Sequence, residues 1–475
     1  MAQPPRNKTT PVPASIATTN PPAGSQHLIS GVAVPVSPGV ATPAGSTAAP
    51  HVGGASQSSK RILEHDLIRQ INLLRDALQS DKAKIGCFIG AGCPLGIYDV
   101  NGQKSLRLIP DVAGLTAHLR TILENNDKSI SLVKDKFIPC WDALMAACIQ
   151  GGVVAVNIEH LLTELRTLTA LKGTGLWQGF AKDHLSKLDE NLCDFIGDAV
   201  GKSLPSHRCS YHRLASWIGG IPRPLPVDIF TPNYDLLTEE AFEQLRIPHF
   251  DGFVGSREPF FDVASIEQDA IPLRWARLWK LHGSINWQRQ SDGRVFRAQG
   301  RAAKGKVMIY PSHLKYDQSR KMPYLAMIDR LRAFFHPGAR VHGSPRVVLI
   351  ICGYSFSDEH LNEVLLDGLR GNSGAHCFVL AYGRLADCQN MVGFARSQPN
   401  LTILAYDGAI VGTREGKYSN LAHPLSSQEA WIGQETSAAG STPVPDDVKC
   451  KLGDFHYFGL FLEHLHGGKG ESIHV

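Results

Sequence analysis

The stretch that decides the fold is Lys84-Ile85-Gly86-Cys87-Phe88-Ile89-Gly90-Ala91-Gly92-Cys93. Its apolar run stops abruptly at Gly90-Ala91-Gly92, which is typical of a buried strand that runs into a glycine turn. Glycine permits a tight turn and lets backbone N–H groups come close to a phosphate, where a Cβ would collide. Many strand ends carry two glycines for turn geometry alone, so the stretch is compatible with a phosphate site and with a plain turn.

Composition describes an ordinary globular protein with no strong charge bias. The 475 residues are 43% hydrophobic and 19% charged, and 48 Lys and Arg against 44 Asp and Glu give a net charge of +4. That balance is too small to indicate direct nucleic-acid binding. No apolar run approaches the roughly 20 residues that a membrane-spanning helix needs. We therefore expect no membrane segment and no nucleic-acid partner.

The ten cysteines form no C-x-x-C pair, and their spacing predicts no zinc or other metal site. Cys87, Cys352 and Cys377 stand inside apolar runs, where a buried thiol is expected. Because the sequence shows no secretory signal, we expect a reducing, cytoplasmic location.

Residues 1–58 consist mainly of Pro, Ala, Ser, Thr, Gly and Val and contain no acidic residue. Such a segment buries too little apolar surface to offset its ordering entropy, which predicts a disordered low-complexity tail. A transit peptide also lacks acids, but it would be Arg-rich, whereas this segment has Arg6 as its single arginine.

The remaining chain alternates strand and helix patterns, which predicts an α/β fold. After a helix at 61–78, apolar strands separated by helices indicate a Rossmann-like parallel sheet covered by helices on both faces. The main domain would span 59–410, with a helical insertion at 136–218, and a C-terminal extension at 411–475 would pack back on this core. The expected strands after the insertion are 226–230, 279–281, 307–310, 347–352, 377–381 and 401–405. The segment 247–273 is expected to be a long loop.

Four of the expected strands end in polar turns: Gly-Ala-Gly at 90–92, Thr-x-Asn-x-Asp at 231–235, His-Gly-Ser at 282–284, and Gly-x-Ser-x-x-Asp at 353–358. In an open parallel sheet, ligands bind beyond the carboxyl ends of the strands, so these turns would meet in one cleft. Each turn also has a structural explanation. Asn and Asp residues, and Ser355 with Asp358, commonly cap the next helix, and a His before Gly can be a hydrogen-bonded turn residue.

Taken in order, the motifs resemble those of the sirtuin (Sir2-type) superfamily. The matching residues are Gly90-Ala91-Gly92-Cys93, Ile109-Pro110-Asp111, Thr231-Pro232-Asn233-Tyr234-Asp235, Leu281-His282-Gly283-Ser284 and Gly353-Tyr354-Ser355-Phe356-Ser357-Asp358. The likeness covers about residues 82–385 without the helical block. It implies a Rossmann-like domain that binds NAD⁺.

Several departures narrow this resemblance. Deacylase sirtuins carry two C-x-x-C pairs that bind zinc, and this chain has none. Cys93 and Pro94 replace the usual Ile-Ser, Val112 follows Asp111, and a large helical insertion precedes the Asn motif. These features are similar to the zinc-less bacterial sirtuin-like NADases of anti-phage defence, which consume NAD⁺ without deacylating a protein.

The resemblance implies a catalytic group of Asn233, His282 and Asp235, and cofactor contacts from Gly90, Ala91, Gly92, Asp111, Thr231, Gly353, Ser355 and Asp358. Asn233 offers a donor and an acceptor to the ribose or to the attacking water. His282 can take a proton from water or from a ribose hydroxyl. Asp235 would orient His282 or stabilise cationic charge, the glycine turn and Ser355 would contact the pyrophosphate, and Asp358 would bind the adenosine ribose.

The expected function is hydrolysis of NAD⁺ to ADP-ribose and nicotinamide by a regulated anti-phage (abortive infection) effector, with NAD⁺ as substrate and no zinc. An NAD⁺-dependent protein deacylase and a non-catalytic nucleotide-sensing scaffold remain alternatives. The resemblance also implies a homo-oligomer and a companion protein such as a HerA-type ATPase or an Argonaute. The trigger, the number of subunits and the preference between NAD⁺ and NADP⁺ do not follow from the sequence.

Overall fold

The computed structural model describes residues 63–124, 134–171, 175–220, 223–268, 271–290, 292–302, 307–309, 323–337, 346–419, 429–435 and 447–466. The tail expected at residues 1–58 lies outside these ranges. The account below concerns the compact unit that contains them, Arg61–Val475.

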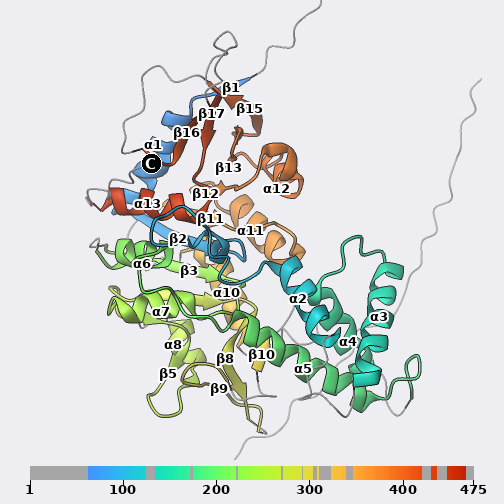
Figure 1. The fold of residues 1–475 in the computed structure, drawn as a ribbon. Helices are drawn as coiled ribbons and strands as arrows, with labels where there is room; N and C mark the ends of the chain where they lie inside the picture. Colours follow the sequence, from blue (N-terminus) through green and yellow to red (C-terminus); the bar gives the residue numbers. More distant parts are fainter. Residues whose placement is uncertain are drawn as a thin grey trace, which may run out of the picture. The chain divides into compact units, whose positions relative to one another are not determined.

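A large, mostly parallel sheet forms the centre of this unit (Figure 1). Its order within the described residues is β1-β15-β14-β13-β12-β11-β2-β3-β7-β4. The strands are β1 (Glu64–His65), β2 (Ala83–Ile89), β3 (Asp228–Thr231), β4 (His249–Phe250), β7 (Ala276–Lys280), β11 (Arg346–Cys352), β12 (Ala375–Leu380), β13 (Leu401–Leu404), β14 (Gly408–Val411) and β15 (Arg414–Tyr418). The β13–β14 and β14–β15 pairs are antiparallel, and the other pairs in this sheet are parallel.

Strand β2, which contains the apolar part of the deciding stretch, lies inside the sheet between β11 and β3. The chain adds β3 and β7 on one side of β2 and later adds β11, β12 and β13 on the other side. The direction of winding therefore reverses between β2 and β11. Such a reversal leaves a crevice at the carboxyl ends of the strands, where open α/β sheets bind their ligands.

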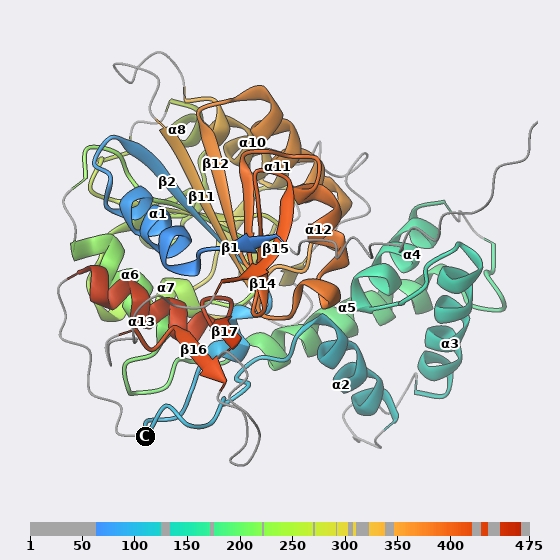
Figure 2. The ribbon, with the colours of Figure 1, turned by 90° about the horizontal axis from the view of Figure 1, so that it is seen from above.

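Helices cover both faces of the sheet (Figure 2). Along β11, Val348 and Ile350 join one apolar core, whereas Val347 and Leu349 join the other, as expected when alternate side chains of a strand point to opposite faces. One core receives α1 (Leu67–Gln79), α6 (Ser210–Gly220), α7 (Leu237–Gln244) and α13 (Phe455–Leu465). The other receives α8 (Val263–Gln268), α10 (Tyr324–Phe335), α11 (Glu359–Gly371) and α12 (Gln389–Ala395). The expected parallel sheet with helices on both faces is confirmed at this level.

A second, antiparallel sheet was not expected. Its order is β10-β8-β9-β6-β5, formed by β5 (Phe253–Val254), β6 (Phe260–Phe261), β8 (Gly283–Arg289), β9 (Val295–Arg297) and β10 (Val307–Ile309). The strand predicted at 307–310 thus exists, but its assignment to the parallel sheet is wrong. The segment predicted as a long loop, 247–273, contains β4, β5, β6 and α8.

The helical region is arranged differently from the expected insertion. Helices α2 (Val112–Glu124), α3 (Lys134–Gln150), α4 (Ile158–Leu171) and α5 (Lys182–Val200) pack against one another. Helix α6, which the sequence placed in the same block, packs instead on α7 and α13. Helix α2, which precedes the expected start of the insertion at 136, therefore packs with α3–α5. Helix α6 belongs to the layer on the main sheet.

The C-terminal region contributes to both the sheet and its cover. Beyond β13 the chain adds β14 and β15 to the main sheet, and β16 (Ile432–Glu435) pairs with β17 (Asp447–Cys450) as a separate ribbon. Helix α13 packs on α6 and on η1 (Cys93–Gly96), the short 3₁₀ turn that follows the glycine stretch. Among the helices that the structure describes, none is long and apolar enough to cross a membrane.

Candidate active site

The four polar turns follow four adjacent strands, in the order β11, β2, β3 and β7. The strands are parallel, and their last residues are nearly level: Cys352 pairs with Ile89, and Thr231 pairs with Lys280. Neighbouring strands lie about 4.8 Å apart. The turns that begin at Gly353, Gly90, Thr231 and His282 therefore emerge side by side along one edge of the sheet.

The glycine turn after β2 uses most of its N–H groups inside the protein. The N–H of Gly90 donates to the carbonyl of Cys352 at 2.9 Å, and that of Gly92 donates to Gly353 at 2.8 Å. The N–H of Cys93 donates back to Gly90 at 3.0 Å. Among the described residues, the N–H of Ala91 has no such acceptor. Ala91 is therefore the residue of this turn whose N–H is left for a ligand, and the contact of Gly90, Ala91 and Gly92 with a phosphate stays a prediction.

Close packing between two strand ends explains why the turn contains glycine. A Cβ on Gly90 would lie 2.2 Å from the carbonyl oxygen of Gly353. Gly353 has a positive φ of +67°, and a Cβ there would lie 2.6 Å from the amide nitrogen of Cys93. The two glycines are therefore required by the contact between the turns after β2 and β11, whether or not a ligand binds.

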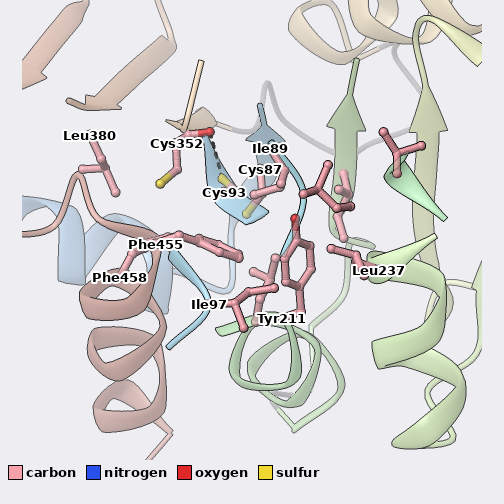
Figure 3. Close-up of a cluster of buried hydrophobic side chains, with 14 of the residues drawn as sticks. Cys87, Ile89, Cys93, Ile97, Tyr211, Leu237, Cys352, Leu380, Phe455 and Phe458 are labelled. Atoms are coloured by element: carbon pink, nitrogen blue, oxygen red, sulfur yellow. Dashed lines mark hydrogen bonds between the residues drawn. The ribbon is translucent and has the colours of Figure 1, made fainter. Parts of the chain in front are cut away.

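Apolar side chains support this turn from below (Figure 3). The thiol of Cys93 is buried and donates to the carbonyl of Cys352 at 3.2 Å. Tyr211 of α6 and Phe455 of α13 meet edge to face, with ring centres 5.0 Å apart, and Tyr211 points toward the strand ends beside Ile97. The C-terminal helix is thus part of the packing that holds the turn.

Asn233 is tied to the glycine turn rather than to the next helix. Thr231 donates its hydroxyl to the carbonyl of Ile89 at 2.7 Å and accepts the N–H of Asn233 at 3.0 Å. The side-chain amide of Asn233 donates to the carbonyl of Gly90 at 3.1 Å. Its Oδ1 accepts no hydrogen bond from the described residues. The capping explanation therefore fails for Asn233, and its amide oxygen is free to accept a hydrogen bond from a ligand.

Asp235 is the residue of this motif that contacts the start of the next helix, although the N-cap position of α7 is Leu236. Its carboxylate accepts the N–H of Leu237 at 3.0 Å, and the ammonium of Lys280 donates to its backbone carbonyl. Lys280 also pairs with Glu239 at 3.2 Å. Burial raises the pKa of the Asp235 carboxyl above its ordinary value, with the charge of Lys280 opposing that shift.

His282 lies between β7 and β8 and is almost completely buried. Its Nε2 is 2.9 Å from Oδ2 of Asp358, and the two side chains are 3% and 8% exposed. This close approach lacks the alignment of a hydrogen bond, because neither ring nitrogen of His282 has a hydrogen-bond partner in the described structure. The carboxylate beside His282 is therefore Asp358, not the expected Asp235.

Asp358 also caps a helix, as the alternative explanation of its motif predicted. Its Oδ1 accepts the N–H groups of His360 at 3.1 Å and Leu361 at 3.2 Å, at the start of α11. The capping role and the contact with His282 use different oxygens of the same carboxylate.

Two other expected ligand contacts lie on accessible side chains. Ser355 is exposed, and its hydroxyl is 2.9 Å from that of Ser357. Asp111 is exposed and caps α2 by accepting the N–H of Gly114 at 2.7 Å. Their contacts with a nucleotide remain predictions.

Two residues near the site were missed from the sequence. Lys280 is 1% exposed, and its signal was a lysine that stands between the apolar residues Trp279 and Leu281, directly before His282. The second is Glu159 of α4, which accepts a hydrogen bond from the hydroxyl of Tyr234 at 3.1 Å. This contact joins the helical block to the Asn233 motif, and nothing in the local sequence around Glu159 indicates it.

The strand order defines a doubly wound α/β protein. Its polar turns gather at the strand ends around β2 and β11, where the direction of winding reverses. Residues 227–393 match the family described as the SIR2-like domain. The match contains Asn233, His282 and Asp358, and it supports a place in the Sir2-type superfamily and an NAD-related function in general. A comparison with curated proteins found no match.

The expected absence of a bound metal ion stays a prediction. Within the ranges that the structure describes, no cluster of three or more His, Cys, Asp or Glu side chains could hold a metal ion. The expectation that the protein works without zinc rests on the missing cysteine pairs.

Proposed function

We propose that this protein is an NAD⁺ glycohydrolase that cleaves the nicotinamide–ribose bond. The observation that carries the proposal is the neighbourhood of three groups at adjacent strand ends: the N–H of Ala91, the amide oxygen of Asn233 and the ring of His282. The chain separates these residues widely, yet β2, β3 and β7 are consecutive in the sheet.

The residues present fit a dinucleotide. Beside β7 lies the two-residue strand β4, which is also parallel. Without β4, the parallel strands β7-β3-β2-β11-β12-β13, numbered along the chain, have the order 3-2-1-4-5-6, which is that of doubly wound sheets that bind dinucleotides across the reversal. The N–H of Ala91 at the end of β2 suits a pyrophosphate oxygen. His282 is buried with both ring nitrogens lacking a hydrogen-bond partner, as expected for a polar side chain whose partner is a ligand.

The proposed chemistry needs orientation, a proton acceptor and water. The bond between ribose C1′ and the nicotinamide nitrogen breaks, its electron pair stays on that nitrogen, and positive charge develops at C1′ as in other glycosyl transfers. Asn233 orients the ribose or the water through Oδ1. His282 takes a proton from the water as its oxygen bonds to C1′. The products are ADP-ribose, nicotinamide and one proton.

The test is incubation of the purified chain with NAD⁺, with and without an acylated peptide. Hydrolysis predicts nicotinamide and ADP-ribose in equal amounts without peptide. Release of O-acyl-ADP-ribose that requires the peptide would instead identify a deacylase. Binding of NAD⁺ without turnover would identify a nucleotide-sensing scaffold.

We predict that His282→Ala and Asn233→Ala each abolish NAD⁺ loss, because the first removes the proton acceptor and the second removes the group that orients ribose or water. Chromatography of the nucleotide products measures the loss, and circular dichroism and thermal unfolding check the fold. His376→Gln is a control, since His376 is a partly buried histidine of this sheet that contacts Thr402 on β13. Wild-type turnover in a folded Ala variant would remove that residue from the mechanism.

We also propose, from the resemblance alone, that the activity belongs to a regulated anti-phage effector. Unregulated loss of NAD⁺ would harm the cell that makes the enzyme, so control by homo-oligomerisation or by a companion such as a HerA-type ATPase or an Argonaute is expected. Size-exclusion chromatography with light scattering, followed by NAD⁺ assays across the eluted species, tests whether activity follows assembly.

A further inference from the structure

His282 has one close charged partner, Asp358, which comes from the opposite side of the four strand ends. His282 follows β7 and Asp358 follows β11, and β2 and β3 lie between these strands. Three strand spacings of about 4.8 Å separate β7 from β11, yet Nε2 and Oδ2 are 2.9 Å apart. We infer that Asp358 is the positioning residue for His282: it holds the ring, selects the nitrogen that carries the proton and leaves Nδ1 for the substrate. This inference rests on the proposed function.

The carboxylate of Asp358 is fixed independently of His282. Its Oδ1 receives two N–H groups at the start of α11, while Oδ2 faces the imidazole. A carboxylate that accepts two backbone N–H groups on one of its oxygens has little freedom to rotate. The second oxygen is consequently held in one place, and the ring adjusts to it.

The loop that delivers Asp358 is also held in place. The hydroxyl of Tyr354 donates to Oδ1 of Asn362 at 2.9 Å, and Nδ2 of Asn362 donates to the carbonyl of Phe356 at 2.9 Å. Phe356 has a φ of +57°, a conformation that a bulky residue adopts only when its surroundings require it. Its ring is buried in the apolar core on the α11 side. The surrounding contacts thus define the course of the loop between β11 and α11.

Asp235, the carboxylate that the sequence suggested for this role, has other partners. It accepts the N–H of Leu237 at the start of α7, and its negative charge is stabilised by Lys280, which also pairs with Glu239. The carboxylate that lies against the ring of His282 is that of Asp358.

The chemical consequence concerns the proton on the imidazole. A neutral imidazole has one N–H donor and one acceptor nitrogen, and a carboxylate beside Nε2 favours the proton there. Nδ1 then has the free lone pair that accepts a proton from water, and Asp358 stabilises the imidazolium that forms. This is the part that the aspartate plays in the Ser-His-Asp triad. Such hydrogen bonds are often poorly aligned before substrate binds, which agrees with the close but misaligned contact.

The kinetic test uses Asp358→Asn, in which the amide oxygen can still cap α11. We expect kcat to fall by about 10²–10⁴-fold, since the corresponding change in a serine protease triad costs roughly 10⁴, with KM changed less than about threefold. Asp358→Glu should recover part of kcat. A residue that binds adenosine ribose would behave in the opposite way, with a raised KM and an unchanged kcat. That result would overturn the inference.

A second readout does not depend on turnover. Long-range ¹H–¹⁵N spectra of protein with labelled histidine rings report which ring nitrogen carries the proton, and the His282 signal is the one missing in His282→Gln. We expect the proton on Nε2 in the wild type and a loss of that preference in Asp358→Asn. An unchanged His282 signal in Asp358→Asn overturns the inference even if kcat falls. If the wild-type chain does not turn over NAD⁺, the proposed function fails, and the spectra alone decide whether Asp358 positions His282.

Discussion

Two aspartates that follow strand ends, Asp358 and Asp235, have different partners in the structure. Asp358 caps α11 with one oxygen and approaches His282 with the other. Asp235 is buried, accepts the N–H of Leu237 at the start of α7, and has the buried ammonium of Lys280 close by. The resemblance implied that Asp235 would orient His282 or stabilise cationic charge. The carboxylate that lies beside the imidazole is that of Asp358, and a catalytic role of Asp235 stays a prediction.

Asp235 gives a prediction for stability against pH. Burial raises the pKa of its carboxyl in the folded state, so the folded protein keeps this proton to higher pH than the unfolded chain does. By linkage, ionisation of this carboxyl lowers the free energy of unfolding as the pH rises from its pKa in the unfolded chain, about 3.9, to its higher pKa in the folded protein. Asp235→Asn keeps an oxygen that accepts the N–H of Leu237 and removes the titration. We expect its melting temperature, relative to the wild type, to rise with pH over that window, measured by thermal unfolding between pH 4 and 7.

Asp99 provides a control of opposite sign. Backbone N–H groups, that of Gln103 foremost, lower the pKa of its exposed carboxyl. Its contribution to stability is present above the unfolded pKa and is lost as pH falls through the folded pKa. The melting temperature of Asp99→Asn relative to the wild type should therefore fall as pH rises. Parallel trends in the two variants would show that the difference does not come from these carboxyls.

The contact between His282 and Asp358 could not be predicted from the sequence. Both residues were recognisable as members of motifs at strand ends, because parallel strands bring such turns to one edge. The path of residues 353–358 depends on the positive φ of Phe356 and on the hydrogen bonds of Asn362. Neither feature has a local sequence signal, so the sequence does not indicate which carboxylate lies beside the imidazole.

At the scale of elements, periodicity predicted the long helices and the buried strands well and predicted the short strands poorly. In β8, Ile285 and Trp287 are buried apolar residues that alternate with Ser284, Asn286 and Gln288. This period-two signal is present in the sequence directly after the His-Gly-Ser turn, but no strand was expected there. The two-residue strands β5 and β6 are too short for any periodicity to appear.

The start of α13 gives a prediction at this scale. Gly453 directly precedes the helix cap Asp454, and a Cβ on it would lie 2.1 Å from the carbonyl oxygen of Ala381 at the end of β12. Gly453→Ala should lower the melting temperature, because the backbone of β12 or α13 must shift at a cost of about 1–3 kcal/mol. Differential scanning calorimetry measures the change.

Gly393 in α12 is the matched control for the same substitution. A Cβ there meets nothing within 4 Å, and alanine stabilises a helix interior over glycine by roughly 0.5–1 kcal/mol. Gly393→Ala should therefore raise the melting temperature. If both variants shift in the same direction, the contact between Gly453 and β12 is not what limits that position.

For the whole molecule, the sequence predicted the class of the sheet but not the order of its strands. Apolar strands separated by helices require a parallel sheet with two covered faces. Which strand lies beside β2 depends on whether each crossover runs to one side or to the other, and right-handed connections are compatible with both. The antiparallel β14 and β15, which extend the sheet, lie in a region whose pattern was less regular.

The thiols give a prediction for the whole molecule. All ten cysteines are free, and Cys388 is the one that is not fully buried. Burial also raises the pKa of the deep thiols, to about 12 for Cys87 and Cys193, and a thiol reacts as its thiolate. An aromatic disulfide reagent at pH 8 should therefore label one thiol per native chain and ten after unfolding. Cys388→Ser should remove the native reaction, whereas rapid labelling of several native thiols would contradict the packing described above.

The central position of β2 has a consequence for dissecting the chain. The family match covers 227–393, but β3 and β11 do not pair with each other, since each forms its ladder with β2. A fragment cut at the limits of the match would expose two unpaired strand edges, and such edges promote aggregation. Expressed alone, that piece should be insoluble, and co-expression with a segment that supplies β2 should restore a soluble complex. The limits of sequence similarity and the limits of an independently folding unit are thus different in this protein.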